Sequence, residues 1–230
     1  LHQLRSAVLK EGADLGIAHD GDADRCLAID AAGNEIDGDH ILTILARGFK
    51  ARGVLKSDTV VGTVMSNLGF MHAMKDAQIN VVTTPVGDRY VLENMIANDY
   101  SLGGEQSGHV IMRQLANTGD GLLTALQLMQ EVVRTGKTLQ ELAATMVRFP
   151  QVLINVKNVA KDKLPANTAI AAAVKRAEDR LGDSGRVLLR ASGTEPLVRV
   201  MVEAASDSLA QEVAQDLADV VQAELSISTN

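Results

Sequence analysis

The sequence predicts an α/β fold with a mainly parallel sheet covered by helices, followed by a small α+β domain. Three observations predict it. Short apolar runs alternate with helical apolar spacing between residues 15 and 135, which is typical of strands joined by crossover helices. Pro150 ends the last of these helical patterns, and the periodicity changes after it, so a domain boundary is expected near residues 148–151. The hydrophobic content of 46% is sufficient for packed cores.

The elements follow from spacing and from capping residues. Helices are predicted over residues 1–10, 40–52, 67–77, 88–97, 121–135, 167–181 and 206–225, with a further helix after Thr138. Strands are predicted over residues 15–18, 26–29, 59–64, 79–83, 151–156, 186–189 and 197–203, with two short strands between residues 101 and 111. Gly12 is expected to end the first helix, Asp39 to cap the second, and Thr138 with Glu141 to form a capping box.

Charge and cysteine content limit the classes of partner. The net charge is -7 and no basic run occurs, which argues against nucleic acid or an anionic membrane as the main partner. Cys26 is the only cysteine, so an internal disulfide is excluded and a reducing, cytoplasmic location is expected. No signal peptide or membrane-spanning apolar run occurs. The chain begins at Leu1 inside a helical pattern, and we therefore expect a fragment of a longer protein.

Three carboxylates lie between the first two predicted strands. Asp20, Asp22 and Asp24 occupy alternate positions in a short loop, at the carboxyl end of a strand, where α/β proteins bind ligands. Alternate spacing lets the three carboxylates converge, and their mutual repulsion then requires a cation. Oxygen ligands of this kind suit Mg²⁺ or Ca²⁺. An EF-hand is excluded because Arg25 and Ala31 stand where its Gly and Glu belong, whereas a polar turn with solvated carboxylates remains an alternative.

Two further loops combine glycine with polar side chains. The loop at residues 103–109 carries Glu105, Ser107 and His109 among three glycines, which indicates either a ligand-binding loop or a plain hairpin. The loop at residues 190–196 offers an arginine, hydroxyl groups and Gly193, with Arg199 beyond it. Such residues bind phosphate in a cradle unlike the Walker motif. An ordinary loop with surface arginines is the alternative.

Taken in order, the sequences DGDADR at residues 20–25, GEQSGH at 104–109 and RASGTEP at 190–196 resemble those of the α-D-phosphohexomutase superfamily. The resemblance covers essentially the whole chain, but only the later half of the family's protein. It implies the end of a second domain at residues 1–36, a third domain at 37–148 and a fourth at 149–230. The second and third domains are implied to be α/β/α sandwiches with a mixed, mainly parallel sheet, and the fourth domain is implied to be α+β.

The resemblance also implies roles for individual residues. Asp20, Asp22 and Asp24 match the Mg²⁺ ligands, and Arg25 matches an active-site arginine beside the metal. Glu105 and Ser107 match contacts to sugar hydroxyls, with His109 beside them as a further substrate contact and catalytic candidate. The clamp for the substrate's non-reacting phosphate matches Arg190, Ser192, Gly193 and Thr194, with Arg199 as an additional member.

Within the superfamily, residues 61–69 and 118–126 and Gln106 are most similar to the bacterial phosphoglucosamine mutase branch. That branch interconverts glucosamine 6-phosphate and glucosamine 1-phosphate through a phosphoserine enzyme and a bisphosphate intermediate. The implied partner is a phosphosugar, and a homodimer is one expected assembly. A phosphomannomutase/phosphoglucomutase and a non-catalytic sugar-phosphate-binding module are the alternatives. No Ser in this sequence is followed by His-Asn, as the family's phosphoserine is, so this chain alone is predicted to be inactive.

Overall fold

The structure is a computed structural model that describes residues 1–193 and 195–227. It divides into two compact units, Leu1–Val147 and Arg148–Asn230, and each is described by itself. No helix in the described ranges combines the length and the apolar character needed to cross a bilayer. The assignment of residues 1–36 to a separate preceding domain stays a prediction.

The first unit begins with a small antiparallel sheet in the order β1-β2-β3. Its strands are β1 (Leu15–Ala18), β2 (Leu27–Asp30) and β3 (Glu35–Ile36). Helix α1 (His2–Glu11) ends at Gly12 in the left-handed conformation, as predicted, and packs Leu4 and Val8 against Gly16 of β1. These strands do not join the parallel sheet that the alternation of elements predicted, because the links between them are too short for crossover connections.

The second sheet of this unit has the order β5-β4-β6-β7. Strand β4 pairs in parallel with β5 and β6, and β7 is antiparallel to β6, so the predicted mixed, mainly parallel sheet is confirmed. The strands are β4 (Thr59–Thr63), β5 (Asn80–Thr84), β6 (Leu102–Gly104) and β7 (Val110–Met112), and the helices are α2 (Gly38–Ala51), α3 (Leu68–Asp76), α4 (Asp88–Ala97), α5 (Gly121–Thr135) and α6 (Leu139–Ala143), with a 3-10 turn at Lys56–Asp58.

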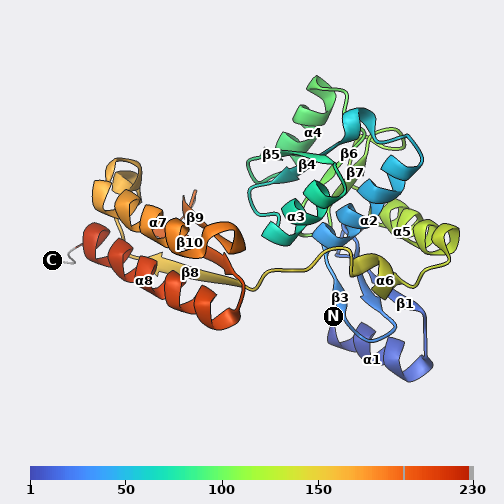
Figure 1. The fold of residues 1–230 in the computed structure, drawn as a ribbon, viewed down its shortest axis with the longest axis horizontal. Helices are drawn as coiled ribbons and strands as arrows, with labels where there is room; N and C mark the ends of the chain where they lie inside the picture. The colour runs from blue at the N-terminus through green and yellow to red at the C-terminus, as the bar shows by residue number, and fades with distance from the viewer. Residues whose placement is uncertain (194, 228–230) are drawn as a thin grey trace. The chain divides into compact units, whose positions relative to one another are not determined.

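Helices cover both faces of this sheet. Neighbouring residues of β4 point to opposite faces, and they belong to different clusters of buried side chains. Val60 packs with residues of α2, α3, α5 and α6, whereas Val61 packs with Val91 and Met95 of α4. Figure 1 shows α4 on one side of the strands and α3 on the other. The result is the α/β/α arrangement that the family resemblance implied.

The cap of α2 differs from the prediction. Asp37 is the N-cap and accepts a hydrogen bond from the backbone N–H of His40 at 3.1 Å. Asp39 lies inside the helix, where its carboxylate accepts a hydrogen bond from the N–H of Asn67 at 2.7 Å. Both residues are suitable caps, and the tertiary contact to Asn67 decides between them.

The second unit is an antiparallel sheet in the order β8-β10-β9 with two helices on one face. Its elements are β8 (Gln151–Lys157), α7 (Thr168–Leu181), β9 (Gly185–Ala191), β10 (Leu197–Ala204) and α8 (Asp207–Leu225), with 3-10 turns at Lys161–Ala166 and Gly182–Ser184. Val198, Val200 and Val202 of β10 pack in one cluster with both helices. This is the predicted small α+β domain.

Cys26 provides a test of the packing in the first unit. Its side chain is fully buried, and burial raises the pKa of the thiol to about 12. Because the thiolate is the reactive form, we expect negligible labelling by iodoacetamide in the folded chain from pH 7 to pH 9, and rapid labelling in urea. Labelling followed by mass spectrometry measures both rates. Equal rates with and without urea would contradict the burial.

Candidate active site

The three carboxylates between β1 and β2 converge as the sequence predicts. Asp20, Asp22 and Asp24 each offer an oxygen, and these oxygens all lie within 4.8 Å of one another. Ala23 adopts a positive φ of 59°, which folds the loop tightly between the two outer carboxylates. Asp20 and Asp22 are exposed, and Asp24 is half-buried.

The electrostatics of this loop favour a cation. The pKa of Asp24 is raised by burial and by repulsion from Asp20 and Asp22, and its Oδ1 is buried without a hydrogen-bond partner. For Asp20, burial acts to raise the pKa, but hydrogen bonds from backbone N–H groups, with the Arg25 guanidinium, lower it overall. A hard divalent cation would relieve the repulsion and supply a partner for the buried oxygen. The residues present therefore fit a Mg²⁺ site.

Arg25 partly neutralises the same cluster. Its Nε lies 3.5 Å from Asp20 Oδ2 and 3.9 Å from Asp24 Oδ1, and its backbone N–H donates to Asp20 Oδ1 at 3.3 Å. The side chain is half exposed, which leaves the guanidinium free to contact an anionic ligand. The neighbouring His19 was not predicted, although its Nδ1 lies 2.9 Å from the carbonyl oxygen of Arg25.

The loop at residues 105–109 is joined directly to the acidic loop. Arg25 and His109 form an isolated antiparallel bridge, and the N–H of Cys26 donates to the carbonyl oxygen of Gly108 at 3.0 Å. His109 is buried, with its Nε2 3.6 Å from Asp24 Oδ2 and 4.0 Å from Asp88 Oδ2. Two motifs far apart in the sequence thus lie side by side in the first unit.

Glu105 and Ser107 occupy the turn itself. The N–H of Gly108 donates to the carbonyl oxygen of Glu105, and Glu105 Oε1 accepts from the N–H of Gly87 at 3.0 Å. Glu105 therefore also holds the start of α4, a contact that sequence spacing does not reveal. Ser107 is exposed at the tip of the turn.

The N-terminal end of α2 supports this turn. Gly38 lies so close to the loop that a Cβ there would overlap the carbonyl oxygen of Glu105 and approach the backbone nitrogen of Gly108. We expect Gly38→Ala to displace the turn and to lower stability by about 1–3 kcal/mol, as overpacking typically does. Urea denaturation measures the loss. Gly21→Ala is the matched control, because its Cβ would meet no heavy atom within 4 Å, and an equal loss in both variants would contradict the proposed contact.

The predicted phosphate loop lies in the second unit, between β9 and β10. Arg190 and Arg199 are direct partners in the two strands, so their side chains lie on one face of the sheet. Neither forms an ion pair with any other described residue. Like charges opposite each other are destabilising, and an anion bound between these arginines would remove that penalty.

Polar groups of the connecting loop complete this arrangement. Ser192 is buried and its hydroxyl oxygen accepts from the N–H of Glu195 at 3.2 Å, which leaves the hydroxyl proton for a ligand. Gly193 is exposed with open space around it, and Thr194 lies outside the described residues. Lys161 was not predicted, because it is distant in sequence. Its Nζ donates to the carbonyl oxygens of Ser192 and Gly193 at 2.5 Å and 3.4 Å.

Comparison with known proteins identifies the family to which this chain belongs. The sequence profile of the phosphoglucomutase/phosphomannomutase α/β/α domain III matches residues 37–149, and the profile of the C-terminal domain of the same proteins matches residues 153–220. The chain belongs to the phosphoglucomutase/phosphomannomutase family of phosphohexomutases. Curated relatives named phosphoglucosamine mutase include those of Frankia alni, 62% identical over 98% of this chain, and Streptomyces griseus, 61% identical over 98%.

This phosphohexomutase chain spans about half the length of those relatives, 50% in both cases. Solved structures share its fold. A phosphoglucomutase/phosphomannomutase family protein from Burkholderia thailandensis superposes with a TM-score of 0.81 at 22% identity, covering 97% of this chain and 49% of its own. The N-acetylphosphoglucosamine mutase of Aspergillus fumigatus, solved with GlcNAc-6P and magnesium, gives 0.77 at 23% identity, covering 91% and 49%.

Proposed function

We propose that this phosphohexomutase chain forms the metal, sugar and phosphate sites of a phosphoglucosamine mutase, which interconverts glucosamine 6-phosphate and glucosamine 1-phosphate. The observation that carries the proposal is the adjacency of two loops in the first unit, where Asp24, one of three converging carboxylates, lies 3.6 Å from His109 of the Glu105–His109 turn. Identity of about 60% to phosphoglucosamine mutases supports the choice of glucosamine over other sugars.

The acidic loop is proposed to hold Mg²⁺ through Asp20, Asp22 and Asp24. A Mg²⁺ ion bound there would neutralise charge on a phosphoryl group, which is the main requirement of phosphoryl transfer. Arg25, whose guanidinium is half exposed beside these carboxylates, would contact the phosphoryl oxygens. His109, whose side chain is buried with Nε2 3.6 Å from Asp24 Oδ2, would position the sugar beside Asp24.

The remaining residues are proposed to bind the substrate. Glu105 and Ser107 would accept and donate hydrogen bonds to sugar hydroxyls. The non-reacting phosphate would bind to Arg190, Ser192, Gly193, Thr194 and Arg199. A clamp that recognises phosphate accepts either phosphorylated end of the sugar, as a mutase with a bisphosphate intermediate requires. The phosphoryl group itself is proposed to be carried by a phosphoserine outside these 230 residues.

A chimera tests the proposal without any assumption about the ends of the chain. Residues 1–230 replace the matching half of the Frankia alni relative, to which they align over 225 residues. We expect the chimera to convert glucosamine 6-phosphate in a Mg²⁺-dependent manner, and to use glucose 6-phosphate and mannose 6-phosphate at least tenfold less efficiently. A folded chimera that prefers either of these sugars would contradict the assignment, and the phosphomannomutase/phosphoglucomutase alternative would replace it.

The phosphate clamp makes a separate prediction. Arg190→Ala is expected to weaken binding of glucosamine 6-phosphate by roughly 10- to 150-fold, because a hydrogen bond to a charged group contributes about 1.5–3 kcal/mol. Binding of unphosphorylated glucosamine should change little. Calorimetric titration of both ligands measures the difference, with Arg176→Ala of α7 as the control. An equal loss for both ligands would mean that Arg190 supports the fold and does not bind phosphate.

A further inference from the structure

A positively charged pocket lies in the first unit, apart from the acidic loop and the Glu105–His109 turn. It is a cavity of about 160 Å³ between α2, α5 and the turn into α6. Its charged lining residues are Arg47 of α2, Glu131 and Arg134 of α5, and Lys137 of the turn, and Ile44 and Leu142 form apolar walls. None of these residues belongs to the acidic loop, the Glu105–His109 turn or the phosphate loop.

The only carboxylate among the lining residues is already occupied. Glu131 is 2% exposed, and its Oε1 accepts from Arg52 while its Oε2 accepts from Arg134 at 2.6 Å. Gly48 of α2 makes this burial feasible, because a Cβ at that position would overlap the Glu131 carboxylate. Both carboxylate oxygens of Glu131 therefore already accept hydrogen bonds from arginines other than Arg47.

The remaining cations of the lining are not held in ion pairs within the described chain. Arg47 and Lys137 form no ion pair with any described residue. Glu141 is close enough for Lys137 to help lower its pKa, but hydrogen bonds from Thr138 contribute more to that shift and hold its carboxylate. The pocket thus concentrates positive charge between apolar walls, in a chain of net charge -7. Such an arrangement raises the local concentration of anions.

We propose that this pocket binds a tetrahedral oxyanion, either inorganic phosphate or the phosphate group of a small metabolite. The guanidinium group of Arg47 can bind two of its oxygens at once, and the Lys137 ammonium supplies a further charge. The volume favours a ligand of this size, because clefts for drug-sized ligands measure roughly 300–1,000 Å³.

An oxyanion bound in this pocket would connect α2 and α5. The N-terminal ends of these two helices contact the candidate active site. Helix α2 contacts the Glu105–Gly108 turn at Gly38, and the N–H of Gly121 at the start of α5 donates to the carbonyl oxygen of Ala23 in the acidic loop. Glu131 lies ten positions after Gly121, which places the pocket about 15 Å further along α5. Because a ligand that binds only the folded state stabilises it, phosphate would stabilise both supports from a distance.

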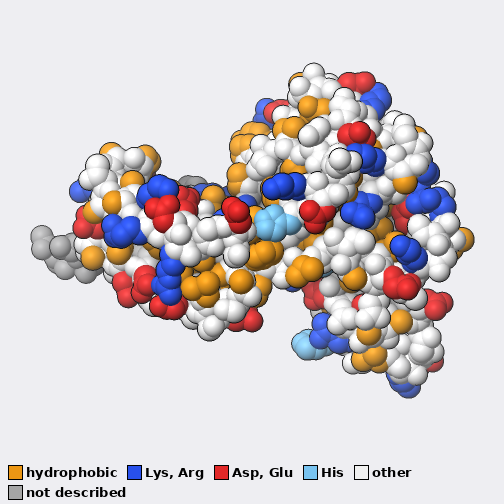
Figure 2. Space-filling model, in the orientation of Figure 1, with side chains coloured by type: hydrophobic (Ala, Val, Ile, Leu, Met, Phe, Trp, Pro, Cys, Tyr) orange, Lys and Arg blue, Asp and Glu red, His pale blue; other side chains and the backbone are white. Residues whose placement is uncertain are grey.

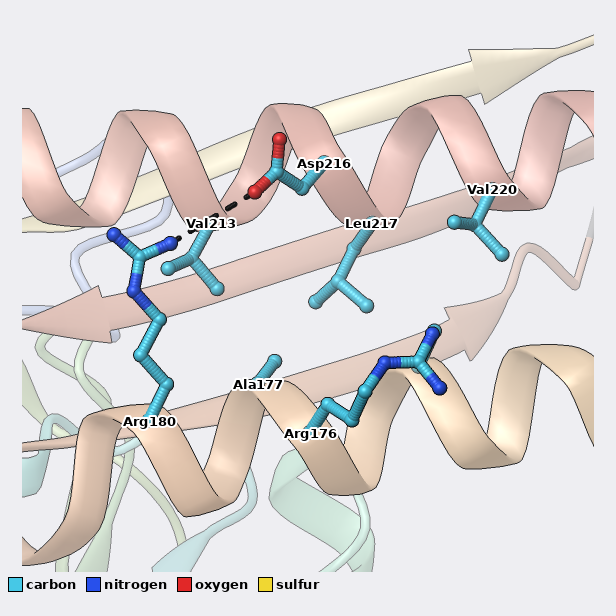
Figure 3. Close-up of a pocket in the computed structure, with 8 residues that line it drawn as sticks. Arg176, Ala177, Arg180, Val213, Asp216, Leu217 and Val220 are labelled. Carbon is cyan, nitrogen blue, oxygen red and sulfur yellow. Dashed lines mark ion pairs between the residues drawn. The ribbon is translucent and has the colours of Figure 1, made fainter.

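The groove between α7 and α8 supplies the control. It has a volume of about 250 Å³, and Figure 3 shows Arg176 and Arg180 extending from α7 on either side of Ala177, with Arg180 paired to Asp216. Arg180 also pairs with Glu212 at 2.9 Å, so acidic residues of α8 already balance the charge of this groove. Arg176 matches Arg47 as a cavity-lining arginine without an ion pair to any described residue.

The experiment is a phosphate titration of the ¹⁵N-labelled 230-residue chain, with chloride added to keep the ionic strength constant. We expect saturable shifts of the backbone amides of Arg47, Gly48, Thr135 and Lys137. Arg47→Ala and Lys137→Ala should each weaken this binding at least tenfold. Arg176→Ala, and Arg190→Ala in the phosphate loop, should leave its Kd within twofold of the wild-type value.

The proposal is overturned if these amides do not shift saturably, or if Lys137→Ala binds phosphate as the wild type does. Lys137 is exposed, so this variant decides the question even if Arg47→Ala fails to fold. A parallel titration with glucosamine 6-phosphate identifies the source of the oxyanion. Tighter binding than inorganic phosphate indicates a metabolite, and equal binding indicates recognition of the phosphate group alone. The readout is independent of mutase activity, so the proposed function and this site fail separately.

Discussion

Asp22→Asn in the Frankia alni chimera is expected to lower turnover at limiting Mg²⁺ by at least about 100-fold. Loss of a residue that only hydrogen-bonds to a metal ligand typically costs about 10- to 100-fold, and loss of a ligand itself should cost more. The substitution removes one of three anionic oxygens that converge within 4.8 Å, and a hard cation binds a neutral amide oxygen more weakly than a carboxylate. The loss should shrink as the Mg²⁺ concentration rises, because the variant retains two carboxylates. Steady-state turnover of glucosamine 6-phosphate across a Mg²⁺ series measures both effects.

Asp14→Asn is the matched control for this variant. Asp14 is an exposed aspartate close in sequence, outside the acidic loop, and its substitution should leave the Mg²⁺ dependence unchanged. Near-wild-type turnover of Asp22→Asn at limiting Mg²⁺ would refute the assignment of this residue as a metal ligand. A loss that persists unchanged at saturating Mg²⁺ would instead indicate a role in orienting the substrate.

The 230-residue chain by itself should show no mutase activity, even when glucosamine 1,6-bisphosphate is supplied as a primer. The reaction needs a nucleophile that stores a phosphoryl group between two half-reactions, and no serine here has the His-Asn context of the family's phosphoserine. Ser107 and Ser192 lie within the candidate sites. Their geometry suits hydrogen bonding, since Ser192 already accepts a hydrogen bond from Glu195.

Conversion of glucosamine 6-phosphate by the purified chain, followed by chromatography of the two phosphosugars, is the measurement. The same chain with Asp22→Asn is the control for contaminating enzyme from the host. Sustained Mg²⁺-dependent turnover by the unmodified chain that is absent from the control would show that one of its own serines carries the phosphoryl group.

Most of the secondary structure could be predicted from the sequence, because strong local signals specify it. Apolar spacing located the helices, Gly12 ended α1, and Thr138 with Glu141 formed the predicted capping box. Local signals were ambiguous where two residues of the same type competed. Asp37 and Asp39 are both good caps, and only the contact from Asn67 to Asp39, between residues far apart in sequence, separates them.

In the candidate site too, features within one loop could be predicted, whereas contacts between distant segments could not. The convergence of Asp20, Asp22 and Asp24 could be predicted because it lies within five residues. The placement of Arg190 in the loop was wrong, because β9 extends to Ala191 and pairs Arg190 with Arg199 of β10. The bridge between Arg25 and His109 could not be predicted, because sequence spacing carries no information about which loops meet. For the same reason Lys161, which donates to the carbonyl oxygen of Ser192, gave no signal.

The bridge between Arg25 and His109 also restricts how substrate preference can be changed by loop exchange. A turn equivalent to Glu105–His109 that is transplanted from a relative would arrive without the backbone of Cys26, whose N–H donates to the carbonyl oxygen of Gly108, and without the close approach of Gly38. Residues 25–26, 38 and 104–109 therefore form one cassette, which must be moved together if the graft is to keep its shape. The loop between β9 and β10 has a tie of its own, because Lys161 donates to the carbonyl oxygens of Ser192 and Gly193, so Lys161 must be moved together with that loop.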